Sequence, residues 1–324
     1  MKVVFCGTPQ FAVPTLKHLL TQPEFEIAAV VTQPDRPSGR GMQVSFSPVK
    51  EAALAAGVPV HQPEKIRSPE SQELLQAIAP DVIVIIAYGQ IIPARLLAIP
   101  KLGWINLHAS LLPKYRGAAP INWAIVNGEG TTGLTTMRID AGMDTGETLL
   151  QTEMAIGPRE TTPELAARMA EAGAPLMTDT LRGIGDGTLA SRAQNHAEAT
   201  YAPLLKKEDG RIDWRLPAKE VYNRMRGFTP WPGAYTTFRE RTCHLVGEPV
   251  SNDVQEAGSQ GTASQRESLP PGTIRFTGHE LVVSCGGATE LRVLSVKQEG
   301  GKKVNAFEFA SGARLTEGER FGNT

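Results

Sequence analysis

Val82-Ile83-Val84-Ile85-Ile86 is a run of five β-branched residues that no polar residue interrupts. A strand of this kind has no side that faces water, so it is expected inside a parallel sheet whose two faces are covered by helices. Strand-like and helix-like segments alternate on both sides of the run, from Val3 to about Gly183. The alternation predicts an α/β fold with a doubly wound, mostly parallel sheet.

The expected elements of this first part follow from apolar periodicity and from Pro and Gly positions. Strands are expected at 3–6, 26–32, 82–86, 104–106, 134–139 and 147–155. Helices are expected at 10–22, 48–56, 70–79, 119–127 and 162–183. Residues 1–188 are therefore interpreted as the first domain.

A second, smaller domain is expected after a polar linker at residues 189–208. From residue 209 to 324 a short helix at 218–226 is followed by turn-separated strands, expected at 234–238, 243–246, 272–276, 281–285 and 291–297. Short strands at this spacing predict a small β-barrel of the OB type. Residues 251–271 are rich in Ser, Gln, Gly and Pro, and they are expected to form a loop.

Composition gives no global sign of a nucleic-acid or membrane protein. The 324 residues carry a net charge of −1, so any contact with a polyanion has to come from local clusters. The three cysteines, Cys6, Cys243 and Cys285, are odd in number and lack CxxC spacing, which argues against a disulfide framework or a zinc site. Lys2 to Cys6 already reads as a strand, and no apolar run approaches the ~20 residues of a membrane span. We expect a soluble, cytoplasmic protein without a metal, and a monomer by default.

Chemistry is concentrated in Asn106-Leu107-His108-Ala109-Ser110-Leu111-Leu112-Pro113 and in the later Gly142-Met143-Asp144-Thr145-Gly146. Asn106 and His108 are two residues apart on a strand, so their side chains point to the same face. Taken singly, each has an ordinary structural explanation. The loop at 140–146 follows the next strand, so it is expected at the same edge of the sheet as His108. An amide, an imidazole and a carboxylate brought together there suit acyl transfer through a tetrahedral intermediate. We predict that Asn106, His108 and Asp144 are catalytic.

The first strand ends at Gly7-Thr8-Pro9, which lacks the further glycines of a dinucleotide-binding turn, so an NAD site is not expected. The loop at Gln33 to Gly41 carries Arg36 and Arg40, and guanidinium groups suit phosphate recognition. A solvated loop explains these two arginines equally well. Further positive charge lies at Lys114, Arg116, Lys206 and Lys207, each of which alone is most simply a surface charge.

The Asn-x-His-x-Ser-Leu-Leu-Pro run and the later Asp-x-Gly-x-Asp-Thr-Gly resemble the 10-formyltetrahydrofolate-dependent formyltransferases. Several further stretches resemble the members of that family that act on methionyl-tRNA, and they extend along nearly the whole chain. These stretches are Phe5-Cys6-Gly7-Thr8-Pro9, Gln33-Pro34-Asp35-Arg36-Pro37, Tyr115-Arg116-Gly117-Ala118-Ala119-Pro120-Ile121, Arg211-Ile212-Asp213-Trp214 and Pro230-Trp231-Pro232.

The resemblance implies transfer of a formyl group from 10-formyltetrahydrofolate to the α-amine of methionyl-initiator-tRNA, for translation initiation. Asn106 would donate to the oxyanion, His108 would stabilise it and help to move a proton, and Asp144 would orient His108. Contacts to the folate are expected from Ile86, Tyr88, Gly89, Gln90, Ile91, Ile92, Ser110, Leu111, Leu112, Pro113 and Asp140. Contacts to the tRNA are expected from Arg36, Arg40, Lys114, Arg116, Lys206 and Lys207, with the β domain along the phosphate backbone.

Two other functions are compatible with parts of the sequence. An amino-sugar nucleotide N-formyltransferase would share the catalytic run, and it is distinguished by the acceptor that it formylates. An RNA-binding β domain attached to an inactive α/β domain is the alternative from a different class. The presence of Asn106, His108 and Asp144 together argues against the inactive form.

Overall fold

The computed structural model describes residues 1–38, 43–250 and 269–322. These residues form two compact units. Unit 1 comprises Met1–Ile121, Gly130–Gly157 and Glu164–Leu204, and unit 2 comprises Asn122–Glu129, Pro158–Pro163 and the chain from Leu205 onward. Most of the expected loop at 251–271 lies outside the described residues, as does Arg40.

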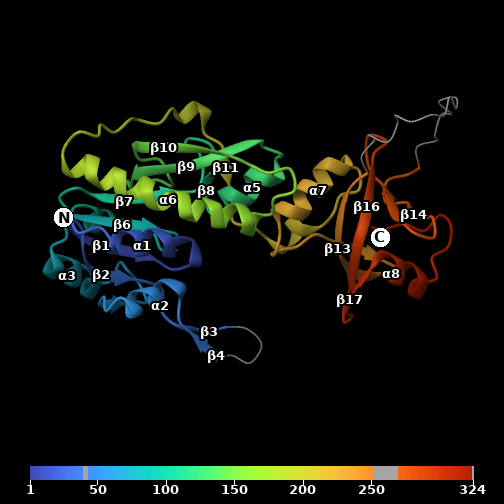
Figure 1. Cartoon of the computed structure of the whole chain (residues 1–324), viewed down its shortest axis with the longest axis horizontal. Helices are drawn as coiled ribbons and strands as arrows, with labels where there is room; N and C mark the ends of the chain where they lie inside the picture. Colours follow the sequence, from blue (N-terminus) through green and yellow to red (C-terminus); the bar gives the residue numbers. More distant parts are fainter. Residues whose placement is uncertain (39–42, 251–268, 323–324) are drawn as a thin grey trace. The chain divides into compact units, whose positions relative to one another are not determined.

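Unit 1 is built on a seven-stranded sheet with the order β10-β9-β7-β6-β1-β2-β5 (Figure 1). Its strands are β1 (Lys2–Gly7), β2 (Glu26–Val31), β5 (Val60–His61), β6 (Val82–Ile86), β7 (Trp104–His108), β9 (Thr131–Arg138) and β10 (Thr148–Ala155). The pairings from β5 to β7 are parallel. The order reverses at β1, which pairs with β2 on one side and β6 on the other, as in a doubly wound fold. The expected α/β sheet is therefore confirmed, and β6 coincides with the β-branched run.

The helices of the first part of the chain are α1 (Val13–Leu20), α2 (Pro48–Ala55), α3 (Pro69–Ile78), α4 (Ala94–Leu97), α5 (Pro120–Val126) and α6 (Thr162–Gly185), with 3-10 turns at Gln10–Ala12 and His196–Glu198. Two of them, α2 and α3, begin where the sequence supplies a capping side chain. The Ser47 and Ser68 hydroxyls each accept a hydrogen bond from a backbone N–H of the first turn, and a proline follows each serine. A serine cap followed by proline satisfies a free donor and presets φ, which explains why α2 and α3 start there.

The two faces of the sheet are covered by different helices, and this decides where the site lies. Trp104 of β7 packs in one apolar cluster with Leu75 of α3 and Leu96 of α4. Leu107 points to the opposite face and meets α6, which runs along the sheet in Figure 1; a Cβ at Gly173 would lie 2.4 Å from Leu107 Cδ2. Because side chains alternate along a strand, Asn106 and His108 share the face of Trp104.

β9 runs antiparallel to β7, whereas the expected βα alternation suggested a parallel strand. The loop from Asp140 to Gly146 was expected at the same sheet edge as His108, because it follows the next strand. In the structure β9 is antiparallel to β7, with Arg138 opposite Ile105 and Thr135 opposite His108. The loop therefore leaves the sheet at the amino end of β7. It returns over the sheet face instead, since Ile139 packs against the cluster that contains Trp104.

Most of the segment expected to be a linker, residues 189–208, is part of unit 1 in the structure. Residues up to Leu204 belong to unit 1. Arg192 forms a backbone bridge with Thr148, and β11 (Tyr201–Ala202) pairs in parallel with β8 (Arg116–Gly117). A second small sheet joins β3 (Arg36–Ser38) to β4 (Gln43–Ser45), at the loop expected to carry the arginines.

Unit 2 contains an antiparallel sheet with the order β12-β13-β16-β15-β14, and β17 also pairs with β16. The strands are β12 (Tyr235–Phe238), β13 (Arg241–Pro249), β14 (Ile274–Phe276), β15 (Leu281–Ser284), β16 (Glu290–Gln298) and β17 (Lys303–Asn305). The helices are α7 (Ala218–Gly227) and α8 (Ala306–Ala313), with a 3-10 turn at Lys207–Gly210. The expected small β domain is thereby confirmed as a half-barrel.

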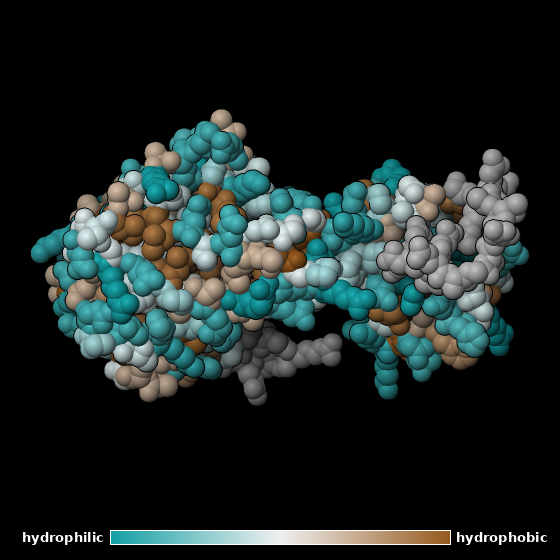
Figure 2. Space-filling model, turned by 45° about the horizontal axis from the view of Figure 1, so that its top comes forward, coloured by the Kyte–Doolittle hydropathy of each residue, from teal (hydrophilic) through white to brown (hydrophobic). Residues whose placement is uncertain are grey.

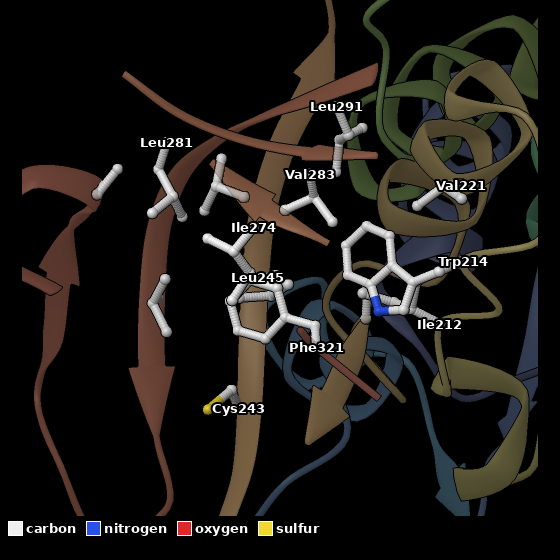
Figure 3. Close-up of a cluster of buried hydrophobic side chains, with 14 of the residues drawn as sticks. Ile212, Trp214, Val221, Cys243, Leu245, Ile274, Leu281, Val283, Leu291 and Phe321 are labelled. Atoms are coloured by element: carbon white, nitrogen blue, oxygen red, sulfur yellow. The ribbon is translucent and has the colours of Figure 1, made fainter. Parts of the chain in front are cut away.

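The core of unit 2 is centred on Trp214 and Phe321, whose rings stack with centroids 5.9 Å apart (Figure 3). Apolar side chains from several strands, including Leu245 and Val283, surround the two rings. The Trp214 indole N–H donates to Thr236 Oγ1 over 3.1 Å, so its one polar atom is satisfied inside the core.

All three cysteines are buried and unpaired, as expected for Cys6. Burial raises the pKa of the Cys285 thiol to about 12, so this thiol stays protonated. The face drawn in Figure 2 is mainly polar, with apolar side chains gathered in small areas. In the described part of the chain, no helix is long and apolar enough to cross a membrane.

Candidate active site

His108, the last residue of β7, is held by a backbone carbonyl. Its Nε2 lies 2.9 Å from the Tyr115 oxygen, and the side chain is 6% exposed. A carbonyl oxygen only accepts hydrogen bonds, so Nε2 carries a hydrogen and Nδ1 is the atom left for chemistry. Nδ1 lies 3.6 Å from Asp144 Oδ2. This separation exceeds a hydrogen bond, so Asp144 acts on the imidazole through its charge, and Tyr115 fixes the ring orientation.

Asp144 is fixed by the neighbouring stretch of backbone. Its Oδ2 accepts a hydrogen bond from the Gly117 N–H over 2.8 Å. The residue has a φ of 52°, a left-handed conformation that aspartate tolerates better than most side chains do. The stretch from Tyr115 to Gly117 therefore orders both His108 and Asp144, by one carbonyl and one amide. Sequence reasoning missed this role because backbone groups leave no signal in residue type.

Asn106 differs from its two neighbours because its carboxamide has no hydrogen-bond partner among the described residues. The side chain is only partly buried, and it lies on the sheet face that also carries His108. A carboxamide N–H that is not engaged elsewhere is available to an oxyanion. The structure thus brings the three predicted catalytic residues to one face, with His108 and Asp144 in contact.

The loop that carries Asp144 is folded tightly around Asp140. Asp140 Oδ1 accepts hydrogen bonds from the Gly142 N–H over 3.0 Å and from the Thr145 hydroxyl over 2.7 Å. A Cβ at Gly142 would meet the Thr145 hydroxyl at 2.0 Å, and one at Gly146 would meet the Arg138 carbonyl at 1.9 Å. Asp140 is thus used to shape the loop. Gly142 permits the tight fold of the loop on itself, and Gly146 permits its close approach to β9.

Replacing Gly146 with alanine is expected to lower both stability and turnover. The new methyl group cannot fit 1.9 Å from a backbone oxygen, so the loop must move, at a cost of ~1–3 kcal/mol in unfolding free energy. Denaturant unfolding and steady-state kinetics measure the two effects. Gly130→Ala is the matched control, because its added methyl has no neighbour within 4 Å in the part of the chain that the structure describes. Equal stability and turnover in the two variants would contradict the packing argument.

The turn after β7 is internally bonded. The Ser110 hydroxyl donates to the Lys114 carbonyl over 2.6 Å, and Ser110 and Leu112 are both buried. The Leu112 N–H donates to Thr135 Oγ1, and Leu111 packs against Gly133 of β9. Ser110, Leu111, Leu112 and Pro113 thus build the turn that presents His108. The structure does not bring the Ser110 hydroxyl or the Leu112 side chain to the surface.

The stretch after β6 exposes one apolar side chain beside buried neighbours. Ile86, Tyr88 and Ile92 are buried, whereas Ile91 is 90% exposed. Gln90 Oε1 accepts a hydrogen bond from the Ile66 N–H over 2.7 Å, and Gly89 adopts a φ of 88°. Of the residues expected to contact folate, Ile91 is the one whose apolar surface is largely open. Met143, in the Asp144 loop, is similarly open with 67% exposed.

The basic residues expected to contact tRNA fall into two groups. Arg36, Lys114, Lys206 and Lys207 are exposed, which suits contact with phosphate. Arg116 is 2% exposed, and its guanidinium donates to Gln194 Oε1 from Nη2 over 2.7 Å. The expectation of a direct phosphate contact by Arg116 is therefore not supported, because the side chain is enclosed and its donors are engaged.

The base of the β3–β4 hairpin is anchored by a carboxylate. Asp35 receives hydrogen bonds from the Lys50 ammonium and from Gln62 Nε2, and these bonds lower the pKa of its carboxyl group. Lys50 also donates to Gln62 Oε1 over 2.7 Å. The three side chains thus tie the start of the hairpin to α2 and to the segment after β5.

Replacing Lys50 with methionine is expected to raise the pKa of Asp35, because the largest cause of the lowered value is removed. In the wild type the folded pKa lies below the unfolded value. The contact therefore stabilises the fold above the ordinary Asp range and loses that effect as pH falls through the folded pKa. Carboxyl ¹³C NMR titration measures the shift, with Lys17→Met, an exposed lysine of α1, as the control. Identical Asp35 titrations in both variants would show that Lys50 does not lower the pKa of the Asp35 carboxyl group.

An open α/β sheet with an amide, an imidazole and a carboxylate on one face, followed by a small β domain, defines an acyl-transfer enzyme. Residues 1–181 match the family model described as formyl transferase, and residues 204–314 match its C-terminal domain. The chain belongs to the formyl transferase family.

Relatives within this family resemble the chain over its full length. The protein named methionyl-tRNA formyltransferase from Koribacter versatilis is 50% identical over 323 residues, which is 99% of each chain. The protein of the same name from Solibacter usitatus is 52% identical, again over 99% of each chain.

Solved structures share the fold at lower identity. A sugar 3N-formyl transferase crystallised with dTDP and 5-N-formyl-THF has a TM-score of 0.63 and 16% identity, over 93% of this chain and 99% of that chain. HypX from Aquifex aeolicus in complex with tetrahydrofolic acid has a TM-score of 0.60 and 16% identity, over 96% of this chain and 48% of that chain. At this identity the likeness shows the fold alone.

Proposed function

We propose that this enzyme transfers the formyl group of 10-formyltetrahydrofolate to the α-amine of methionyl-initiator-tRNA. The full-length identity of about half with relatives named methionyl-tRNA formyltransferase is the observation that carries the choice of acceptor. The arrangement of Asn106, His108 and Asp144 supports the chemistry. The products are N-formylmethionyl-tRNA for translation initiation and tetrahydrofolate. We propose a cytoplasmic location, because translation uses the charged tRNA there.

The reaction begins when the neutral α-amine attacks the formyl carbon and forms a C–N bond. The formyl oxygen becomes an oxyanion, to which the free carboxamide N–H of Asn106 donates. His108 Nδ1 lies on the same face and stabilises the same charge when it is protonated. The carbonyl of Tyr115 holds the opposite nitrogen, so the ring does not turn as charge develops.

A single proton moves from the attacking amine to N10 of the folate. Asp144 Oδ2 is held by the Gly117 N–H, and Oδ1 has no partner among the described residues. Asp144, with His108 Nδ1 3.6 Å away, accepts the amine proton and returns it to N10 as the C–N10 bond breaks. An aminoacyl ester amine is less basic than a lysine, so no covalent enzyme intermediate is needed.

We propose that the folate lies against the exposed apolar side chains of the two loops that flank the site. Ile91 and Met143 are exposed on the two loops after β6 and β9, and an aromatic ring laid against them would remove apolar surface from water. Ile86, Tyr88, Gly89, Gln90 and Ile92 would form the floor, with backbone groups for the ring edge. Ser110 to Pro113 and Asp140 would shape the walls.

Phosphate contacts are proposed for the exposed cations Arg36, Lys114, Lys206 and Lys207. Counterion release makes such contacts weaken as salt rises, so each lost contact reduces the slope of log affinity against log salt by about one. Lys114→Ala is expected to reduce this slope. Lys101→Ala, an exposed lysine that precedes the amino end of β7, is the matched control. A slope that salt titration shows to be unchanged in Lys114→Ala would remove this contact from the proposal.

The acceptor is tested by formylation assays with methionyl-initiator-tRNA, the same tRNA uncharged, and an amino-sugar nucleotide. The proposal expects formylation of the charged tRNA alone. Formylation of the sugar nucleotide instead would replace it with an activity like that of the sugar 3N-formyl transferase that shares the fold. Binding of tRNA without formylation of any acceptor would favour an RNA-binding protein.

A further inference from the structure

The Gln194 carboxamide bridges the catalytic loop and a buried arginine. Its Nε2 donates to the Asp144 carbonyl over 2.9 Å and to the Gly146 carbonyl over 2.7 Å. Its Oε1 accepts from Arg116 Nη2 over 2.7 Å and from Arg116 Nε over 3.2 Å. Gln194 is 8% exposed, so these four bonds form in a largely dehydrated place.

The orientation of this carboxamide is determined by its partners. Carbonyl oxygens only accept hydrogen bonds and a guanidinium only donates them. Only one orientation therefore satisfies both sides, with Nε2 toward the loop and Oε1 toward Arg116. Arg116 is itself fixed, because its Nη1 also contacts His196 Nδ1 over 3.2 Å.

The two carbonyls that Gln194 holds belong to Asp144 itself and to the second residue after it. They lie on either side of Thr145, and Asp144 is in the left-handed region at φ 52°. Backbone in this region persists only where its surroundings hold it. The Asp144 carboxylate is thus held from two directions, by Gly117 on its Oδ2 and by Gln194 on its backbone.

Both supports depend on β8, one through the Gly117 amide itself and the other through the bonds from Arg116 to Gln194. Gly117 directly follows Arg116, and β8 is kept in place by pairing with β11. A shift of Arg116 would therefore move the Gln194 bonds and the Gly117 amide together.

We propose that Gln194 is a positioning residue for formyl transfer, which sets the place of the Asp144 carboxylate beside His108. This inference rests on the proposed function. Misplacing a catalytic group by about 1 Å can cost ~10²-fold in rate, so a bond to the loop backbone acts on turnover without touching the substrate.

Gln194→Glu is the informative substitution. It keeps the size of the side chain and gives Arg116 a stronger partner, so the fold retains its buried contact. It also places a carboxylate oxygen against the two loop carbonyls, which then face an acceptor and move away. We expect kcat to fall by about 10- to 100-fold, while KM for charged tRNA stays unchanged. Asn195→Ala is the control, since among the described residues the Asn195 side chain bonds only to 197 and 198.

A double-mutant cycle separates positioning from general damage. In an Asp144→Asn background, adding Gln194→Glu is expected to cause little further loss, because the group that Gln194 positions is already disabled. An equal loss in both backgrounds would overturn the proposal, as would a wild-type kcat in folded Gln194→Glu.

A readout that needs no turnover keeps the inference distinct from the proposed function. Hydrogen exchange at the Gly117 amide, which donates to Asp144 Oδ2, is expected to be faster in Gln194→Glu than in Asn195→Ala. Wild-type protein that formylates no acceptor would refute the proposed function, and unchanged Gly117 exchange would refute the positioning role of Gln194.

Discussion

Asp144→Asn is expected to reduce formyl transfer by ~10²–10⁴-fold, the range of a general acid–base group. Asparagine keeps an oxygen that accepts the Gly117 N–H, so the side chain stays where it is. The change removes the negative charge 3.6 Å from His108 Nδ1 and the ability to take up a proton. Single-turnover kinetics with charged tRNA and 10-formyltetrahydrofolate measure the chemical step.

The matched control for this charge loss is Asp186→Asn, the same change at an exposed carboxylate just after α6. It is expected to leave the rate unchanged. Thermal unfolding of both variants should match the wild type, since neither loses a buried contact. A folded Asp144→Asn protein with a near-normal single-turnover rate would remove Asp144 from the mechanism.

Asn106→Ala is expected to lower the rate of formyl transfer by ~10²–10³-fold with little change in stability. The carboxamide makes no hydrogen bond to the described residues, so its removal leaves no buried group unpaired. Its N–H is instead expected to be used only when the oxyanion forms. The loss should therefore appear in kcat more than in KM for either substrate.

Asn106→Asp provides a sharper version of the same test. The side chain keeps its size but loses its donor and places a negative charge where the oxyanion develops. It should be at least as impaired as Asn106→Ala. A folded Asn106→Asp protein that turns over faster than Asn106→Ala would contradict an oxyanion contact at this position.

Local pattern was enough to locate the central strands and to place two of the predicted catalytic residues on one face of the sheet. The run at Val82 to Ile86 has no polar face, so its place inside the parallel sheet followed from composition alone. The two-residue spacing of Asn106 and His108 likewise fixed their common face. Proximity of Asp144 was expected for a reason that the structure corrects, since its loop crosses the sheet face from the opposite edge.

The features that could not be predicted depend on partners that are distant in the sequence or on elements that are very short. A strand such as β9 has the same side-chain alternation in either direction, so its antiparallel pairing with β7 had no local sign. Arg116 resembled a surface charge because its partner, Gln194, is 78 residues away. β11 is only two residues long, too short for a periodic pattern.

One missed element did have a signal. α8 begins at a capping box in which Asn305 and Glu308 bond each other's backbone N–H groups. An N-cap residue followed three positions later by glutamate is a recognisable helix start.

The most direct test of the account follows a labelled formyl group through one turnover. Enzyme in excess is mixed with formyl-labelled 10-formyltetrahydrofolate and methionyl-initiator-tRNA, and the reaction is quenched with acid at short times. Direct transfer within the Asn106, His108 and Asp144 site predicts label in the aminoacyl product only, at a rate that Asp144→Asn lowers by ~10²–10⁴-fold. Label bound to the protein before product appears, or an absence of labelled product from folded wild-type enzyme, would contradict it.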